Sequence, residues 1–61
     1  MKRRDLVRHL DKNGCYLDRE GANHSIHRNP ENGRYAAVPR HREIKETTAR
    51  TICDQLGISR P

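Results

Sequence analysis

Four histidines and two cysteines are the side chains of this 61-residue chain that could take part in catalysis or hold a metal ion. Imidazole, whose ordinary pKa lies near 6.5, is the group best suited to moving protons at neutral pH. One reaction that it serves is cleavage of an RNA phosphodiester, which needs a base for the 2′-hydroxyl proton and an acid for the leaving oxygen. The same reaction needs positive charge close to the phosphate.

His24 is the histidine whose position best suits such chemistry. It directly follows Gly21-Ala22-Asn23, which predicts a tight turn, and it begins a predicted strand over residues 24–28. A side chain at such a point is expected near the surface, where functional residues concentrate. On the residues alone, a half-buried structural histidine on the face of Ile26 is the simpler interpretation, because one histidine in a hairpin is a weak signal.

The spacing of the histidines and cysteines argues against a metal site and against cysteine chemistry. Zinc modules use closely spaced ligand pairs, and the chain has no Cys-x-x-Cys. His24 and His27 are three apart in a predicted strand, so their side chains point to opposite faces. Cys15 and Cys53 occupy apolar positions, which predicts small buried hydrophobic residues. We therefore expect no metal and no other cofactor.

Positive charge is the second feature that suggests a function. Thirteen Lys and Arg against eight Asp and Glu give a formal net charge of +5. Basic clusters on a folded domain suit a polyanion, most often nucleic acid, although an acidic protein fits the same field. His41 lies inside the cluster formed by Arg40-His41-Arg42 and Lys45, where it is either a phosphate contact or a solvated loop residue. The side chains expected to hold an RNA backbone are Lys2, Arg3, Arg4, Arg8, Arg40, Arg42 and Lys45.

A helix is predicted near each end of the chain. Apolar spacing predicts a helix over residues 3–13 that Asn13-Gly14 ends, and a second over residues 47–56 that Gly57 ends. Thr47 is the expected N-cap of the second helix. The three basic residues at the start of the first helix oppose its dipole, which suggests that something other than local stability favours them.

Three strands are predicted between the helices, over residues 15–20, 24–28 and 34–38. Strict alternation in the first strand predicts one face made of Cys15, Leu17 and Arg19 and another made of Tyr16, Asp18 and Glu20. In the third strand the inward residues are expected to be Ala36 and Val38. The simplest closure is a single α+β domain over residues 1–61, with a three-stranded antiparallel sheet and both helices packed on one face.

Length and composition exclude several classes of protein. No apolar run approaches the roughly 20 residues that span a bilayer, and no leader resembles a secretory signal. Two cysteines cannot build a disulfide-dense scaffold. The chain is also too short for a dinucleotide-binding unit with a substrate domain. We expect a small, soluble, cytoplasmic domain.

Several segments taken together make the chain similar to the HicA toxins, which are small mRNA interferases of toxin–antitoxin pairs. The similar segments are Asn13-Gly14-Cys15-Tyr16-Leu17-Asp18-Arg19, Gly21-Ala22-Asn23-His24-Ser25-Ile26, Val38-Pro39-Arg40-His41-Arg42-Glu43-Ile44, Ile52 and Leu56-Gly57-Ile58. The resemblance departs from the family pattern at Asn23, where many members have Ser or Thr. It covers nearly the whole chain.

The resemblance implies a fold like that of double-stranded-RNA-binding domains, in the order α-β-β-β-α. It further implies that His24 is the catalytic residue of a ribosome-independent endoribonuclease that cleaves mRNA and transfer-messenger RNA. Asn23, Ser25 and His41 are the auxiliary candidates beside it. A HicB-type antitoxin is expected to cover His24, with the free toxin monomeric and the toxin–antitoxin complex of higher order.

Two other functions remain open from the sequence. A non-catalytic RNA-binding module would have the same fold and the same basic clusters. Duplex recognition uses long surfaces, however, and 61 residues leave little such surface. A ribosomal or adaptor protein is a third possibility, disfavoured by the eight acidic residues interspersed among the basic ones and by the lack of a basic extension.

Overall fold

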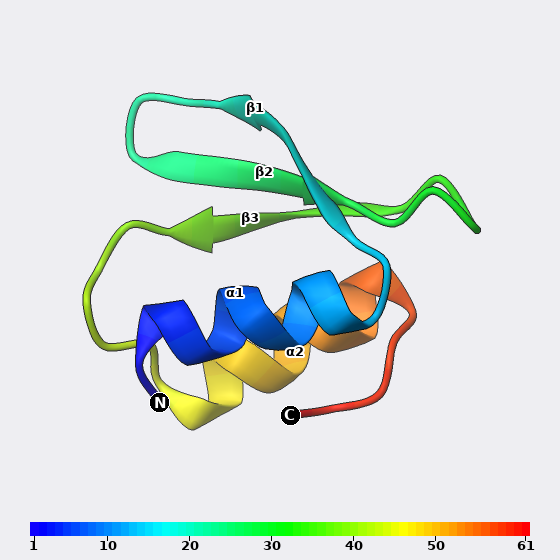
Figure 1. Ribbon diagram of the computed structural model, residues 1–61. Coiled ribbons are helices and arrows are strands. Elements are labelled where there is room, and N and C mark those ends of the chain that lie inside the picture. Colours follow the sequence, from blue (N-terminus) through cyan, green and yellow to red (C-terminus); the bar gives the residue numbers. More distant parts are fainter.

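The computed structural model describes residues 1–61 and contains five elements. They are α1 (Arg3–Lys12), β1 (Tyr16–Glu20), β2 (His24–Arg28), β3 (Tyr35–Pro39) and α2 (Glu46–Leu56). The order α-β-β-β-α is the predicted one, and the strands form an antiparallel sheet in the order β1-β2-β3. Both helices lie on the same side of the sheet (Figure 1). Neither has the length and apolar character needed to cross a membrane.

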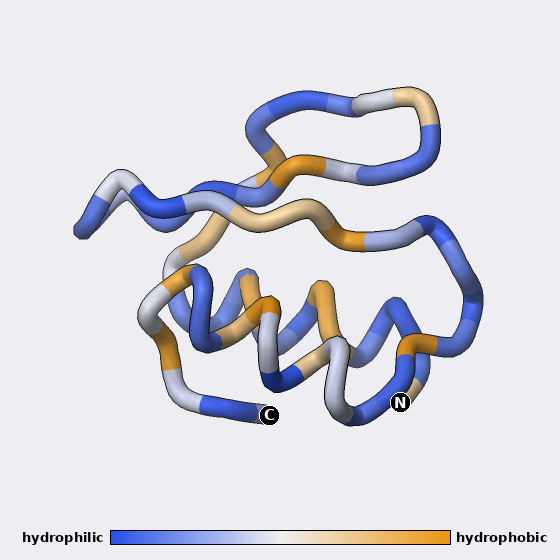
Figure 2. The backbone as a smooth tube through the Cα atoms, turned by 180° about the vertical axis from the view of Figure 1, so that it is seen from behind, coloured by the Kyte–Doolittle hydropathy of each residue, from blue (hydrophilic) through white to orange (hydrophobic).

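The core lies between the helices and the sheet face that they cover. Ten buried apolar side chains form it. Leu6 and Leu10 come from α1, while the spacing of Ala49, Ile52, Cys53 and Leu56 gives α2 one apolar face. The apolar colour recurs along both helices and β3, while the loop between β2 and β3 is largely hydrophilic (Figure 2). Cys15 and Cys53 are free and buried, as predicted, and burial raises the pKa of each thiol.

The ends of the helices largely follow the glycine signals in the sequence. Gly14, just beyond α1, and Gly57, at the end of α2, have φ angles of 82° and 70°, in the region that glycine enters without a Cβ clash. The start of α2 differs from the prediction. The helix begins at Glu46 with Lys45 in the N-cap position, and no side chain caps it. Thr47 is therefore inside the helix, where its carbonyl accepts a hydrogen bond from the Thr51 hydroxyl at 3.0 Å.

The loop between β2 and β3 caps the C-terminus of α2. The side-chain amides of Asn29 and Asn32 both donate to the carbonyl of Leu56, at 2.9 and 3.0 Å. These contacts satisfy a carbonyl that the end of a helix leaves without an intrahelical partner. The Pro- and Asn-rich segment is thus both the hairpin loop between β2 and β3 and a tertiary contact that holds α2 against the sheet.

A β-bulge in β1 overturns the predicted alternation of that strand. Tyr16 and Leu17 pair with Arg28 and His27, but the register then shifts by one residue, so that Arg19 pairs with Ile26 and Glu20 with Ser25. Directly paired residues share a face. Leu17 and Glu20 therefore lie on the helix side, and Tyr16 and Arg19 lie on the outer face. A bulge inserts one unpaired residue and so reverses the facing of everything after it.

The sheet face that the helices cover carries polar side chains from β2 beside apolar ones from β3. Ser25 and His27 of β2 are buried there, opposite Val38 and Ala36 of β3. The inward facing of Ala36 and Val38 is as predicted. Because β2 alternates, His24, Ile26 and Arg28 lie on the outer face. The shared face of His24 and Ile26 and the opposite facing of His24 and His27 are therefore also confirmed.

Candidate active site and basic cleft

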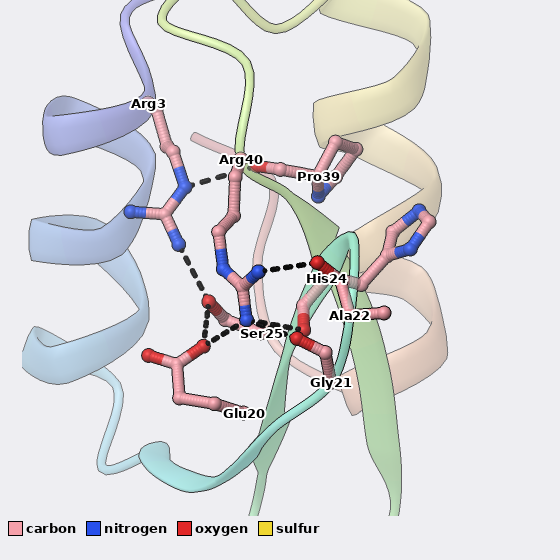
Figure 3. A network of polar contacts seen from close by, with 8 residues as sticks. All are labelled: Arg3, Glu20, Gly21, Ala22, His24, Ser25, Pro39 and Arg40. Carbon is pink, nitrogen blue, oxygen red and sulfur yellow. Dashed lines mark hydrogen bonds and ion pairs between the residues drawn. The ribbon is translucent and has the colours of Figure 1, made fainter.

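His24 begins β2 on the outer face of the sheet and is exposed. Its imidazole projects away from the polar network formed by the neighbouring side chains (Figure 3). The ring lines an open hollow of about 950 Å³, whose other walls include Ile26 and Tyr35 of the sheet and Thr48 and Thr51 of α2. No hydrogen bond within the chain occupies its ring nitrogens, so both are available to a ligand.

The backbone that carries His24 is fixed by a turn and by the side chain of Arg40. The amide of Gly21 donates to the carbonyl of His24 at 2.8 Å. The guanidinium of Arg40 donates to the carbonyls of Ala22 and His24, at 2.8 and 3.2 Å, and to that of Gly21. Arg40 also pairs with the Glu20 carboxylate at 2.7 Å. The planar guanidinium of Arg40 therefore binds three carbonyls of the turn and links them to the Glu20 carboxylate of β1.

A second set of contacts lies behind the turn, on the helix side (Figure 3). The Ser25 hydroxyl, only 1% exposed, accepts a hydrogen bond from Arg3 Nη2 at 2.8 Å and donates to Glu20 Oε1 at 2.7 Å. Nε of Arg3 donates to the Pro39 carbonyl at 2.9 Å. Ser25 thus lies on the opposite face of β2 from the His24 imidazole, and it can act on His24 only through the backbone.

The Glu20 carboxylate is held in its ionised form by these partners. Hydrogen bonds from Arg40 and then from Ser25 lower its pKa below the ordinary value of 4.5. An ionised Glu20 is what keeps both contacts charge-assisted. The sequence offered no signal for this role, because the bulge that turns Glu20 toward Ser25 is not marked by a glycine or another distinctive residue.

Five of the seven predicted RNA-binding side chains meet in one cleft. A hollow of about 370 Å³ is lined only by Lys2, Arg3, Arg4, Arg40 and Arg42. It forms because the start of α1 lies against the loop after β3, where the amide of Arg3 donates to the carbonyl of Arg42 at 2.9 Å. We call these five residues the basic cleft. Cationic charge so concentrated attracts a polyanion such as a phosphate backbone.

The other predicted contacts lie outside the basic cleft. Arg8 is one turn further along α1, with its guanidinium 3.7 Å from the carboxylate of Asp5. Lys45 is exposed at the N-cap of α2. Within the cleft, the side chains of Arg3 and Arg40 already bind carbonyls and Ser25 or Glu20. The donors left free for a ligand therefore come mainly from Lys2, Arg4 and Arg42.

The remaining candidates are dispersed. Asn23 and His41 are exposed, with no side-chain hydrogen bond. His27 is 3% exposed, and burial, assisted by the positive charge of Arg3, lowers its pKa below 6.5. His9 Nε2 lies 2.7 Å from the carbonyl of Ser59. No three side chains of His, Cys, Asp or Glu come together as a group that could hold a metal ion.

A comparison with known families identifies the relationship. The family model described as the HicA toxin of bacterial toxin–antitoxin matches residues 3–58, from the first residue of α1 to just beyond α2. The chain belongs to the HicA toxin family. This confirms the resemblance found in the sequence. No curated protein and no solved structure gives a match to the chain.

Membership of the HicA toxin family makes the chain a toxin of the toxin–antitoxin kind. The matched residues contain His24 and its turn, the Arg40 guanidinium and all of the basic cleft except Lys2. The exposed imidazole of His24 and four of the five residues of the basic cleft therefore lie within the segment that matches the HicA family model.

Proposed function

We propose that this HicA-family toxin is an endoribonuclease that cleaves mRNA and transfer-messenger RNA without the ribosome and so inhibits translation. The observation that carries the proposal is the exposed, unbonded imidazole of His24, held above an open hollow by a turn that Arg40 anchors. The accessible imidazole supplies a proton-transfer group, and the cationic residues nearby supply the positive charge that RNA cleavage needs. His24 is the proposed catalytic residue.

The proposed reaction uses the nucleophile that RNA itself carries. The neutral His24 imidazole accepts the proton of the 2′-hydroxyl while the 2′-oxygen attacks the adjacent phosphorus. The bond from phosphorus to the 5′-oxygen breaks, the 5′-oxygen takes a proton from water, and His24 releases the proton that it accepted to solvent, so that a 2′,3′-cyclic phosphate and a 5′-hydroxyl result. The net proton transfer runs from the 2′-oxygen to the 5′-oxygen, which a general acid–base group mediates without a cofactor.

Auxiliary roles are proposed for three polar residues next to His24 or Arg40 in the chain: Asn23, Ser25 and His41. Asn23 precedes it in the turn, and its exposed amide could contact the substrate. Ser25 acts as a positioning residue, through its contacts with Arg3 and Glu20. His41 follows Arg40 on the exposed loop and is a further candidate contact.

The basic cleft is the proposed binding site for the RNA backbone away from the scissile bond. Arg40 belongs to the cleft and also binds the carbonyl of His24, so the cleft adjoins the turn that carries the imidazole. A strand whose phosphates occupy the cleft would cross the β1–β2 turn to reach His24. Arg8 and Lys45, outside the cleft, would contribute only at longer range.

A HicB-type antitoxin that covers His24 is the proposed protein partner. The family is one of toxins paired with antitoxins. A net charge of +5 favours an acidic partner, whose association would be steered by charge and slowed by salt. We propose a monomeric free toxin in the cytoplasm and a complex of higher order with the antitoxin.

Induced expression and cleavage by purified protein test this function. The variant His24→Ala should lose growth arrest and RNA cleavage while its thermal unfolding resembles that of the wild type, since the side chain is exposed. His9→Ala is the matched control and should retain cleavage, because His9 lies on α1 and contacts the backbone of Ser59. Full cleavage by His24→Ala would remove His24 from the mechanism.

A non-catalytic RNA-binding module is the second candidate, favoured by the basic cleft, which needs no catalytic group to hold RNA. The two functions are separated by one result. Purified wild-type protein that binds RNA, with affinity lost on substitution in the cleft, but that never cuts any RNA would establish the binding module.

A further inference from the structure

The outer face of the sheet carries two tyrosines and an arginine in one row. Tyr16 of β1 pairs directly with Arg28 of β2, and Arg28 pairs directly with Tyr35 of β3, so the three side chains stand side by side. Both rings are open to solvent, Tyr16 at 44% and Tyr35 at 57% exposure. Tyr35, the more exposed of the two and the one that lines a hollow, is the candidate contact for a ligand, because a large exposed aromatic side chain on a small basic domain indicates a binding surface.

Arg28 holds the ring of Tyr35 from one side. Its guanidinium carbon lies 5.3 Å from the centroid of the Tyr35 ring, within the range of a cation–π contact. No carboxylate pairs with Arg28, and its Nε is buried without a hydrogen-bond partner. A buried donor without a partner is uncommon in a folded protein. Arg28 therefore orients the aromatic ring and leaves an unneutralised charge next to it.

A continuous concave surface joins this row to His24. Tyr35 and Ile26 line the same large hollow as His24, and both also line a smaller one of about 100 Å³ with Arg28 and Arg19. His24 and Arg28 are the two ends of β2, so they are separated by about 13 Å along the strand. A short run of nucleotides bridges such a distance.

The charge and chemistry of this surface favour an unpaired base of RNA as its occupant. The arginines along it are Arg19, Arg28 and Arg34, against the carboxylates of Asp18 and Asp54. The second carboxylate is already paired with Arg60 at 3.0 Å. Aromatic side chains with arginine beside them stack on bases of single strands, whose faces a duplex keeps hidden.

We propose that Tyr35, backed by Arg28, is a stacking subsite for an unpaired nucleobase of single-stranded RNA whose backbone continues to His24. This proposal rests on the proposed function. It restricts the substrate of the proposed endoribonuclease to single-stranded segments of RNA. Tyr35 binds the base, and the sheet sets the spacing between the stacked nucleotide and the scissile phosphate.

Tyrosine fluorescence gives a direct test, because the chain has two tyrosines and no tryptophan. The variant Tyr16→Phe, combined with His24→Ala to prevent cleavage, leaves Tyr35 as the only tyrosine. Titration with a single-stranded RNA oligonucleotide should quench its emission. The same strand annealed into a duplex, or an abasic strand with the same phosphates, should bind more weakly and leave the emission unchanged.

Substitutions measure the contribution of the ring. In the His24→Ala background, Tyr35→Phe should bind single-stranded RNA as the parent does, and Tyr35→Leu and Tyr35→Ala should bind it about 5- to 150-fold more weakly. Tyr16→Ala is the control, because Tyr16 lies across Arg28 and outside both hollows. Leu keeps an apolar side chain on β3, and thermal unfolding of each variant shows whether a loss of binding accompanies a loss of folded protein.

The outcomes separate this subsite from the catalytic proposal. Equal binding by Tyr35→Leu and its parent, or equal affinity for normal and abasic strands, would overturn the stacking subsite even if the wild type cleaves RNA. Unchanged RNA binding with lost binding of an antitoxin protein would assign the face to that partner and overturn the proposal as well. Quenching by RNA that the wild type never cuts would support the subsite while contradicting the nuclease.

Discussion

Arg40 binds the carbonyl of His24, with its Nη2 3.2 Å from that oxygen. The two residues are 16 apart in the chain, and the contact joins the loop after β3 to the start of β2. From its place in the sequence, Arg40 is expected among the phosphate-binding residues. The structure shows its guanidinium engaged with three carbonyls and with Glu20, so its first role is to fix the turn that presents the imidazole.

Replacing Arg40 by Lys should therefore lower the cleavage rate more than the affinity for RNA. Lysine keeps the positive charge of the basic cleft but lacks the planar fork that binds several carbonyls at once. We expect kcat to fall by about tenfold or more with KM changed less, because small displacements of a catalytic group are costly. Steady-state cleavage of a defined RNA measures the split between the two constants.

The matched control for that substitution is Arg42→Lys. Arg42 lines the same cleft, and its side chain makes no hydrogen bond within the chain. The kcat of the Arg42→Lys variant should stay near that of the wild type. Equal kcat losses in Arg40→Lys and Arg42→Lys would show that charge in the cleft, and not the geometry of the turn, governs the rate.

Removing charge from the basic cleft should reduce the salt dependence of RNA binding. Each phosphate contact with a single strand contributes about 0.7 to the slope of log K against log salt concentration. Arg4→Ala and Arg42→Ala should each lower the slope by about that amount, irrespective of RNA sequence. Arg8→Ala is the comparison, since Arg8 faces Asp5 outside the cleft and its loss should leave the slope nearly unchanged. A larger effect at Arg8 would place the backbone-binding surface elsewhere on α1.

Acid should weaken the fold partly through Glu20. Its pKa in the folded chain lies below the ordinary 4.5, because Arg40 and Ser25 donate to the ionised form. Its contribution to the free energy of unfolding is therefore complete above about pH 4.5 and is lost as the pH falls through the lowered pKa. Glu20→Gln should flatten the stability profile in that acid range, as urea unfolding at a series of pH values would show. An unchanged profile would mean that the contacts of Glu20 contribute no net stability.

The buried His27 should make stability depend on pH in a different range. Burial holds its folded pKa below 6.5, so below that pH the unfolded chain takes up a proton that the folded chain does not. The contribution of His27 to the free energy of unfolding should consequently be complete above about pH 6.5. It should decrease as the pH is lowered from 6.5 toward the lower pKa of the folded chain. His27→Leu should remove this part of the dependence, whereas the exposed His41→Ala should retain it. Parallel profiles for wild type and His27→Leu would contradict a neutral buried imidazole.

Local patterns in the sequence were sufficient for most of the elements. The helical periods of Leu6 and Leu10 and of Ala49, Ile52 and Leu56 identify both helices, since a repeat near 3.6 residues requires one buried face. The alternation of β2 correctly separates the exposed His24 from the buried His27. These properties depend on neighbours within a few residues, so they can be read without knowing what packs against the segment.

The facing of β1 and the organisation of the site were decided by tertiary structure. The bulge after Leu17 reverses the facing of Arg19 and Glu20, and no residue type marks it. Some basic side chains bind other groups of the protein and others remain free for a ligand. This division depends on contacts between residues far apart in the chain, such as Arg3 with Ser25 and Arg40 with Glu20. The types and rough positions of the candidate functional side chains follow from the sequence alone. Their division between positioning and binding follows only from packing, because a guanidinium acts on whichever carbonyls and carboxylates the fold brings within reach.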